Sequence, residues 1–241
     1  GEHNGVQRRQ LGGVVEVHEL DGVAVVPTIL VADVLVLAVK PQVMAEAIAG
    51  IAPTVSSTGA VVMSIAAGFT IASMQNRLGE PAAIVRCMPN TPALLGSGAS
   101  ALYANEHTSA VQREYTQYVL SAVGLAVWVE NEALLDAVTA LSGSGPAYFF
   151  LFMEAMIAAG VELGLDSKTA TQLTHQTALG AARMAIENEV PLAELRRRVT
   201  SPGGTTQSAI ENFEQNNLNT VVAQAMQAAA NRAVQMAEEM A

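Results

Sequence analysis

Two short, almost uninterrupted apolar runs constrain the fold of this chain more than any other feature. VLVLAV occupies residues 34–39 and VVMSIA occupies residues 61–66. A strand has this composition when helices cover both faces of its sheet, as they do in a parallel α/β sheet. A sheet with one face in water would carry polar residues at alternate positions instead. The two runs therefore predict a buried, doubly wound sheet.

Strand and helix patterns alternate up to about residue 130, and only helical patterns follow. The expected strands are residues 14–17, 34–40, 60–66, 83–88, 101–104 and 125–129. The expected helices of the first part are 41–51, 70–78 and 108–123, with Thr70 as an N-cap. We therefore predict an incomplete Rossmann-like α/β nucleotide-binding domain at 1–130 and an all-α dimerisation and substrate domain at 131–241.

The helical part should contain six helices, with Asp166 capping the third. Their expected ranges are 132–139, 146–164, 167–187, 191–199, 205–215 and 218–240. Pro146 and Pro191 fall in first-turn positions, where proline costs little. Helix 146–164 is apolar nearly all round, so we expect it to be central and buried.

Composition narrows the classes of partner. Hydrophobic residues make up 51% of the 241 residues and charged residues 14%, which indicates helices buried against a second copy of the chain. The net charge of −10 disfavours nucleic acid and anionic membranes. The longest apolar run, 147–161, is too short for a bilayer and contains Glu154. A single cysteine, Cys87, excludes an internal disulfide and fits a reducing cytoplasm.

Small residues follow three of the expected strands, where ligands bind in parallel sheets. AVKPQ (38–42) and SIAAGF (64–69) would let a flat ring or a pyrophosphate approach the backbone, although ordinary turns packed with small residues would look the same. In MPNTPALLGSG (88–98), the polar pair Asn90 and Thr91 could face a cofactor. The alternative is a rigid loop in which Asn90 caps its own turn.

LSGSGPA (141–147) and TSPGGTT (200–206) predict two flexible, hydroxyl-bearing loops that each open a helix. Glycine lets backbone N–H groups approach an anion, and a helix N-terminus adds unpaired donors. Two such loops could bind a carboxylate without a cationic side chain, or they could serve turn geometry and packing alone. His175 has no second ligand at metal spacing and Cys87 lies in an apolar strand, so we expect no metal site and no cysteine nucleophile.

AVKPQ, SIAAG, RCMPNTPAL, LSGSGPAY and VTSPGGTT, in this order, resemble the pyrroline-5-carboxylate reductase family over about residues 31–241. ELRRRVTSPGGTTQSAIENF (194–213) is similar to the family signature. The resemblance implies reduction of 1-pyrroline-5-carboxylate to L-proline, the last step of proline biosynthesis, with NADPH or NADH. It also implies a cytoplasmic homodimer joined through the C-terminal helices, with room for a higher oligomer.

The resemblance also implies the site residues. The cofactor would lie at the three strand ends, on Ala38, Val39, Lys40, Pro41, Ile65, Ala66, Ala67, Asn90 and Thr91. The substrate would lie among Ser144, Gly145, Glu189, Ser201, Gly203, Gly204, Thr205 and Thr206. Backbone at Gly204 and Thr205 would receive its carboxylate, and Thr206, the expected catalytic residue, would bind its ring nitrogen.

One departure from the family pattern stands at the N-terminus. The expected strand followed by a G-x-G-x-x-G turn is missing; Gly12 and Gly13 do not make that spacing, and residues 4–11 look like the family's second helix. We therefore expect a truncated chain whose central strands expose apolar edges and whose activity is weakened. The alternatives are a non-catalytic dimer, or another reductase of imines or hydroxy acids. The latter usually carries a helical catalytic lysine, and the helical part here has only Lys168, away from the loops.

Overall fold

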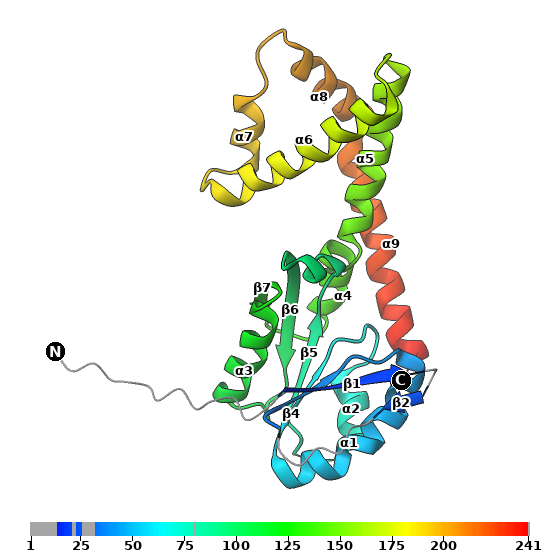
Figure 1. Ribbon diagram of the computed structural model, residues 1–241, viewed down its shortest axis with the longest axis vertical. Helices are drawn as coiled ribbons and strands as arrows, with labels where there is room; N and C mark the ends of the chain where they lie inside the picture. The colour runs from blue at the N-terminus through cyan, green and yellow to red at the C-terminus, as the bar shows by residue number, and fades with distance from the viewer. Residues whose placement is uncertain (1–13, 21–22, 26–31, 80, 241) are drawn as a thin grey trace, which may run out of the picture. The chain divides into compact units, whose positions relative to one another are not determined.

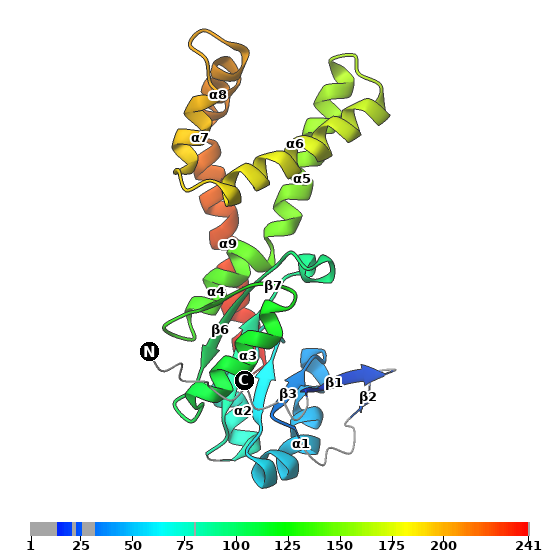
Figure 2. The same ribbon diagram turned by 60° about the vertical axis from the view of Figure 1, so that its left-hand side comes forward.

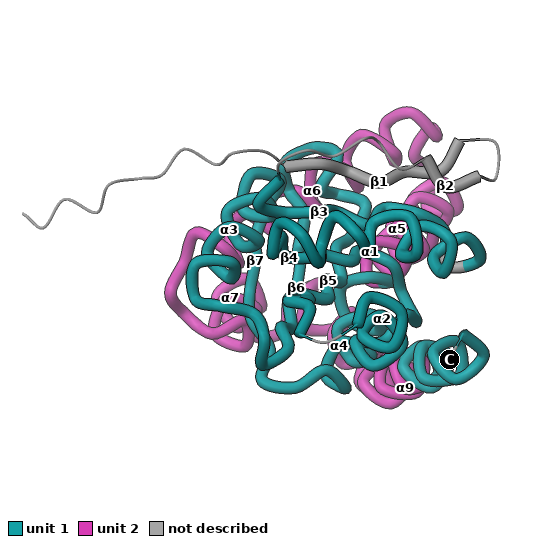
Figure 3. The backbone as a smooth tube through the Cα atoms, turned by 90° about the horizontal axis from the view of Figure 1, so that it is seen from below, with its two compact units in different colours: residues 1–144, 228–241 teal, residues 145–227 magenta. Residues whose placement is uncertain are grey.

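The computed structural model describes residues 14–20, 23–25, 32–79 and 81–240 (Figure 1 and Figure 2). These residues form two compact units, one of residues 1–144 with 228–241 and one of residues 145–227 (Figure 3). Among the described residues, every strand belongs to the first unit. Residues 4–11, Gly12 and Gly13 lie outside the described residues.

The first unit is built on one sheet of order β2-β1-β3-β4-β5-β6-β7. Its strands are β1 (Val14–Leu20), β2 (Val23–Val25), β3 (Val34–Leu37), β4 (Val61–Ser64), β5 (Ile84–Met88), β6 (Gly98–Ala104) and β7 (Gly124–Trp128). Strands β1, β3, β4 and β5 run parallel, whereas β6 is antiparallel to β5 and parallel to β7. All six strands expected from the sequence are present; β2, which is three residues long, was not expected.

Helices cover both faces of this sheet, as the apolar runs predict. The helices of the first part are η1 (Pro41–Val43), α1 (Met44–Thr58), α2 (Ile71–Leu78) and α3 (Ala110–Ser121), with a 3-10 turn η2 (Thr91–Leu95). Leu35 and Leu37 pack with residues of α1 and α2 on one face. Val34 and Val36 pack with Leu120 of α3 on the other. The alternation of side chains along β3 therefore builds two apolar cores from one strand.

Helix ends follow the local signals closely. The Thr70 hydroxyl accepts a hydrogen bond from Ser73 N at 3.1 Å, and the Asp166 carboxylate accepts one from Thr169 N at 3.0 Å, so both predicted N-caps are confirmed. Helix α1, by contrast, runs past the predicted end at residue 51 and contains Pro53. Its apolar face continues through Val55, and this burial outweighs the backbone bond that the proline removes.

The apolar edge expected beside residues 34–37 is not open. All four residues of β3 pair with β1, from Val34 opposite Val14 to Leu37 opposite Val17. The expectation of an exposed edge is therefore wrong for this strand, because a parallel neighbour satisfies its backbone groups.

The helices that follow β7 are divided between the two units. Helix α4 (Leu134–Val138) and the π-helical turn η3 (Thr139–Gly143) are in the first unit, and the second contains α5 (Gly145–Glu162), α6 (Ser167–Glu187), α7 (Leu192–Arg198) and α8 (Thr205–Gln215). Helix α9 (Leu218–Glu239) begins in the second unit and ends in the first. The predicted boundary at 130/131 thus differs from the division between units, since Leu135 and Ala140 are buried in the first unit and Met240 packs on its core.

Helix α5 is not buried within the single chain. Of its residues only Gly145 is buried, whereas Phe149 is 70% exposed and Leu151 is 67% exposed. The expectation of a central, buried helix is therefore wrong for one copy of the chain. The longer helical run Leu134–Glu162, which contains the apolar run 147–161, is long and apolar enough to cross a bilayer by length and composition only.

Asn105 provides a test of how the first unit is held together. Its side-chain oxygen accepts hydrogen bonds from Ile84 N at 3.0 Å and from the Thr108 hydroxyl at 2.8 Å, and its amide donates to Ala82 O at 2.9 Å. Replacing Asn105 by Ala leaves buried backbone groups unpaired, and we expect the free energy of unfolding to fall by about 3 kcal/mol. Urea denaturation at one fixed protein concentration measures this loss.

Asn188→Ala is the matched control, because the Asn188 amide makes an exposed hydrogen bond to Met184 O. We expect this control to cost less than about 1 kcal/mol. Equal losses in the two variants would contradict a bracing role for Asn105.

Candidate functional site

Three parallel strand ends meet at one edge of the first unit. Ile65, which follows β4, donates its backbone N–H to Leu37 O of β3 at 3.2 Å, and Ser64 stands opposite Arg86 of β5. The predicted cofactor segments therefore lie side by side. Within the first of them, Ala38 is half-buried and Lys40 is exposed. Val39 is only 5% exposed and packs in the core with α1, so its side chain does not face this edge.

A hollow of about 730 Å³ lies on the α3 side of this edge. Three of the predicted cofactor residues line it, Ile65, Asn90 and Thr91, together with Met88 and Gly143. Residues of α3 form another wall, and most of the lining is apolar. Ala66 instead packs toward the core formed with α1 and α2. A mostly apolar hollow at the carboxyl ends of parallel strands suits an aromatic ring.

Asn90 does not cap its own turn. Its side-chain oxygen accepts a hydrogen bond from Ala99 N at 2.8 Å, and its amide donates to Ser142 O at 3.0 Å. The side chain therefore ties the loop after β5 to β6 and to η3. Asn90 lines the hollow while its polar atoms are engaged by the protein, so it shapes the wall through these contacts.

The predicted loop at 141–147 is helical instead. Residues Thr139–Gly143 form a π-helical turn, closed by a 2.8 Å hydrogen bond from Ser144 N to Thr139 O, and α5 begins at Gly145. A Cβ on Gly143 would lie 2.6 Å from the Met88 methyl carbon, so a larger residue here would displace the end of this flexible side chain. π-Helical turns inside helices occur often at functional sites.

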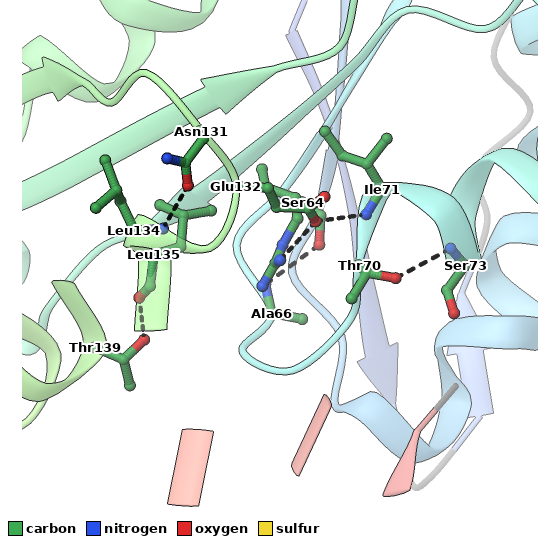
Figure 4. Close-up of polar contacts among 11 residues, drawn as sticks. Ser64, Ala66, Thr70, Ile71, Ser73, Asn131, Glu132, Leu134, Leu135 and Thr139 are labelled. Atoms are coloured by element: carbon green, nitrogen blue, oxygen red, sulfur yellow. Dashed lines mark hydrogen bonds and ion pairs between the residues drawn. The ribbon is translucent and has the colours of Figure 1, made fainter. Parts of the chain in front are cut away.

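The structure contains an ion pair that the sequence analysis did not identify, between Arg86 of β5 and Glu132. Glu132 is labelled in Figure 4. Glu132 Oε1 accepts hydrogen bonds from the Arg86 guanidinium and from Ile71 N, each at 2.7 Å. The Arg86 side chain is 9% exposed. Burial raises the pKa of nearby Asp136, with the Arg86 charge opposing the rise and the Glu132 charge adding to it. The sequence signal for this ion pair was the arginine inside the apolar strand IVRCM, because a buried cation requires an acidic partner.

Cys87 is a core residue. Burial raises the pKa of its thiol to about 12, although a hydrogen bond with Ser100 opposes this rise. The thiol therefore stays protonated and unreactive at neutral pH, as expected from its place in an apolar strand. Among the described residues, no group of three or more His, Cys, Asp or Glu side chains is arranged to hold a metal ion.

The TSPGGTT loop of the second unit opens α8 as predicted. Gly204 is the N-cap and no side chain caps the helix. The first hydrogen bond along the helix joins Ser208 N to Gly204 O, so the N–H groups of Thr205 and Thr206 precede the intrahelical ladder. Such donors, aided by the helix dipole, suit a carboxylate.

The glycines of this loop serve its turn. Gly203 has φ +69°, and its N–H donates to the Gln207 side-chain oxygen at 2.7 Å. Gly204 N donates to Ser201 O at 3.0 Å. The expectation that the Gly204 N–H receives an anion is therefore not met in this conformation; Thr205 and Thr206 carry the available donors. Glu189 is exposed in the segment between α6 and α7.

The three arginines Arg196–Arg198 are engaged by carboxylates. Glu194 accepts from Arg197 at 2.7 Å and from Arg198 at 2.9 Å, and these bonds lower the pKa of Glu194 to about 2. Arg196 lies 3.5 Å from Glu214 of α8. The run therefore braces the two helices that flank the TSPGGTT loop.

Gly68 tests how tightly the turn after β4 is packed. Its φ is +78°, and a Cβ there would lie 3.1 Å from Met240 Sδ and 3.5 Å from the Met236 backbone. For Gly68→Ala we expect the free energy of unfolding to fall by about 2 kcal/mol, from backbone strain and from the displaced end of α9. Denaturant titration measures the loss.

Gly59→Ala separates these two causes. Gly59 has a similar φ of +69°, but a Cβ there would meet nothing within 4 Å. We expect it to lose about 1 kcal/mol from strain alone. Losses of the same size in both variants would show that the contact with α9 contributes nothing.

Residues 132–236 match the family described as pyrroline-5-carboxylate reductase dimerisation. A curated relative, pyrroline-5-carboxylate reductase of Pseudomonas aeruginosa, is 52% identical over 236 residues, which span 97% of this chain and 85% of the relative. The relative of the same name from Pasteurella multocida is 48% identical over 205 residues, or 85% of this chain and 74% of that one.

Solved structures are similar in the same way. A pyrroline-5-carboxylate reductase from Coxiella burnetii superposes with a TM-score of 0.83 at 46% identity, covering 85% of this chain and 76% of that one. A pyrroline carboxylate reductase from Plasmodium falciparum, solved with NADP bound, superposes with a TM-score of 0.77 at 32% identity, covering 86% of this chain and 78% of that one.

Proposed function

Because this chain belongs to the pyrroline-5-carboxylate reductase family, we propose that it reduces 1-pyrroline-5-carboxylate to L-proline with a hydride from NADPH or NADH. The observation that carries this proposal is the 52% identity to a reductase across nearly the whole chain. The chain is thus an oxidoreductase of the class that acts on CH–NH groups. It forms a homodimer through residues 132–236, which match the dimerisation family.

The reaction places few chemical demands on side chains. The protonated imine accepts a hydride at the carbon doubly bonded to nitrogen, and the nitrogen keeps its proton. The reduced nicotinamide supplies the hydride and becomes oxidised. The protein must hold two rings face to face and exclude water, and orientation alone is worth roughly 7–11 kcal/mol in favourable cases. A buried, protonated Cys87 is consistent with a mechanism that uses no nucleophile.

The proposed cofactor site is the carboxyl edge of the sheet. We assign the nicotinamide ring to the apolar hollow lined by Ile65, Thr91 and Gly143, because an apolar hollow at the strand ends suits a ring. The segment Ile65–Ala67 would lie near the nicotinamide half of the dinucleotide. The segment Ala38–Pro41 would contact its adenosine and phosphate side. The reductase of Plasmodium falciparum, solved with NADP, supports this choice of ligand.

The proposed substrate site is the N-terminus of α8. The N–H groups of Thr205 and Thr206 would bind the carboxylate, and the Thr206 hydroxyl would accept a hydrogen bond from the protonated ring nitrogen. The uncapped helix start supports this assignment. Ser201 and Gly203 shape the loop. Ser144, Gly145 and Glu189 complete the proposed set.

The exposed apolar surface supports the proposed assembly. The dimerisation match begins at residue 132 and includes the whole run Leu134–Glu162, so a partner subunit accounts for the apolar surface of α5. Further apolar side chains are exposed on α6 and α9, among them Leu173, Leu179 and Val221. We include a higher oligomer of dimers and a cytoplasmic location in the proposal; light scattering tests the former.

Thr206 provides the test of the substrate site. For Thr206→Val we expect kcat/KM for pyrroline-5-carboxylate to fall by about tenfold to hundredfold, the loss that follows from one hydrogen bond to a charged group. Loss of NADPH absorbance follows the reaction. Thr206→Ser keeps the hydroxyl, and we expect it to stay within about threefold of the unaltered chain.

Two outcomes would contradict the proposal. Equal rates for the Val and Ser variants would remove Thr206 from the reaction. An unaltered chain that dimerises, yet neither binds nor oxidises NADPH, would favour the non-catalytic dimer.

A further inference from the structure

The carboxylate of Glu132 joins three segments of the first unit that carry proposed site residues (Figure 4). One oxygen, Oε1, accepts hydrogen bonds from the Arg86 guanidinium and from Ile71 N, each at 2.7 Å. Arg86 lies on β5, two residues before Met88, and Ile71 is the first residue of α2. Glu132 itself stands just before α4.

The turn between β4 and α2 is thereby held at both ends. At its start, Ile65 N donates to Leu37 O at 3.2 Å and Ala66 N donates to the Ser64 hydroxyl at 3.3 Å. At its end, Ile71 N donates to Glu132. The turn contains the proposed cofactor segment Ile65–Ala67. The hydrogen bond to the Glu132 carboxylate therefore fixes the position of the end of this turn relative to the sheet.

A second chain of contacts leads from Glu132 to the hollow. Leu135 of α4 is buried in the first unit, and its carbonyl accepts a hydrogen bond from the Thr139 hydroxyl at 2.7 Å. Ser142 O accepts from the Asn90 amide at 3.0 Å. Gly143 follows directly and lines the hollow. Displacing the segment at Glu132 therefore displaces two walls of the hollow together.

The ion pair can hold the three segments in place because the Arg86 side chain is buried and the Glu132 side chain is partly buried. The Arg86 side chain is 9% exposed and that of Glu132 is 28% exposed, so water competes weakly for either group. Asp136 lies near enough to feel both charges. Neither Arg86 nor Glu132 lines the hollow, so any effect on a bound ring passes through other residues.

We propose that Glu132, oriented by Arg86, is a positioning residue that sets the placement of the Ile65–Ala67 turn, the Met88–Thr91 segment and Gly143 around the hollow. The inference rests on the proposed function, since it names a further residue on which the reductase depends. It assigns to Glu132 no contact with cofactor or substrate.

Glu132→Gln in the dimer of the 241-residue chain is the test. The amide keeps an oxygen for Ile71 N and removes the charge that faces Arg86. We expect kcat to fall by about tenfold and the Kd of NADPH to rise by about fivefold, because small misplacements of reacting groups are costly. The KM for pyrroline-5-carboxylate should stay within about twofold, because the proposed substrate donors belong to α8.

Two further variants complete the design. Glu187→Gln removes an equally charged carboxylate from an exposed pair with Arg183, at 2.9 Å, and we expect wild-type constants. Arg86→Gln should cause the same change as Glu132→Gln, and the double variant should be no worse than either, because the two residues act as a unit.

Hydrogen exchange at the backbone N–H groups of residues 65–71 provides a readout that does not depend on turnover. We expect exchange there to be about tenfold faster in Glu132→Gln than in Glu187→Gln. Glu132→Gln could instead lower the melting temperature and leave kcat, NADPH affinity and hydrogen exchange unchanged at temperatures where the fold is intact. Glu132 is then a purely structural residue, and the inference is overturned.

Failure of the proposed function looks different. An unaltered chain that does not oxidise NADPH overturns the reductase assignment, whatever the variants do. The exchange comparison then still decides whether Glu132 holds the turn: faster exchange in Glu132→Gln supports the positioning role, and equal exchange refutes it.

Discussion

A guanidinium buried inside a sheet that is covered on both faces must find a carboxylate, and this requirement organises the edge at which the first unit carries its proposed cofactor site. The Arg86 guanidinium of β5 donates a hydrogen bond to Glu132 Oε1. The same oxygen accepts a hydrogen bond from Ile71 N at the start of α2 (Figure 4). One acidic side chain thus connects the sheet, the turn after β4 and the segment that leads into α4.

The two proposed binding surfaces belong to different units and differ in kind. The first offers an apolar hollow with few polar groups, suited to a flat ring. The second offers backbone donors at the start of α8, suited to a carboxylate. Hydride transfer to an imine needs this pairing of functions more than it needs an acid, a base or a nucleophile. The protonated, buried state of Cys87 agrees with this economy of side-chain chemistry.

Helix α5 shows why hydropathy alone is ambiguous. A helix that is apolar all round can be a core helix, a membrane span or an interface, and it satisfies the length and composition criteria for the second. In the single chain it is exposed. The match of residues 132–236 to a dimerisation family decides among these possibilities, because it gives the helix a protein surface to pack against.

The sequence by itself determined the features that neighbouring residues encode. The six expected strands, the helices that follow them and the caps at Thr70 and Asp166 were predictable, because periodicity and capping are local. The family motifs also located both proposed binding segments. Tertiary structure alone decided the pairing of β1 with β3, the bonds of Asn90, the π-helical turn before α5 and the ion pair of Arg86 with Glu132, 46 positions apart. These contacts depend on which distant groups are left unsatisfied when the sheet closes, and no local pattern records that.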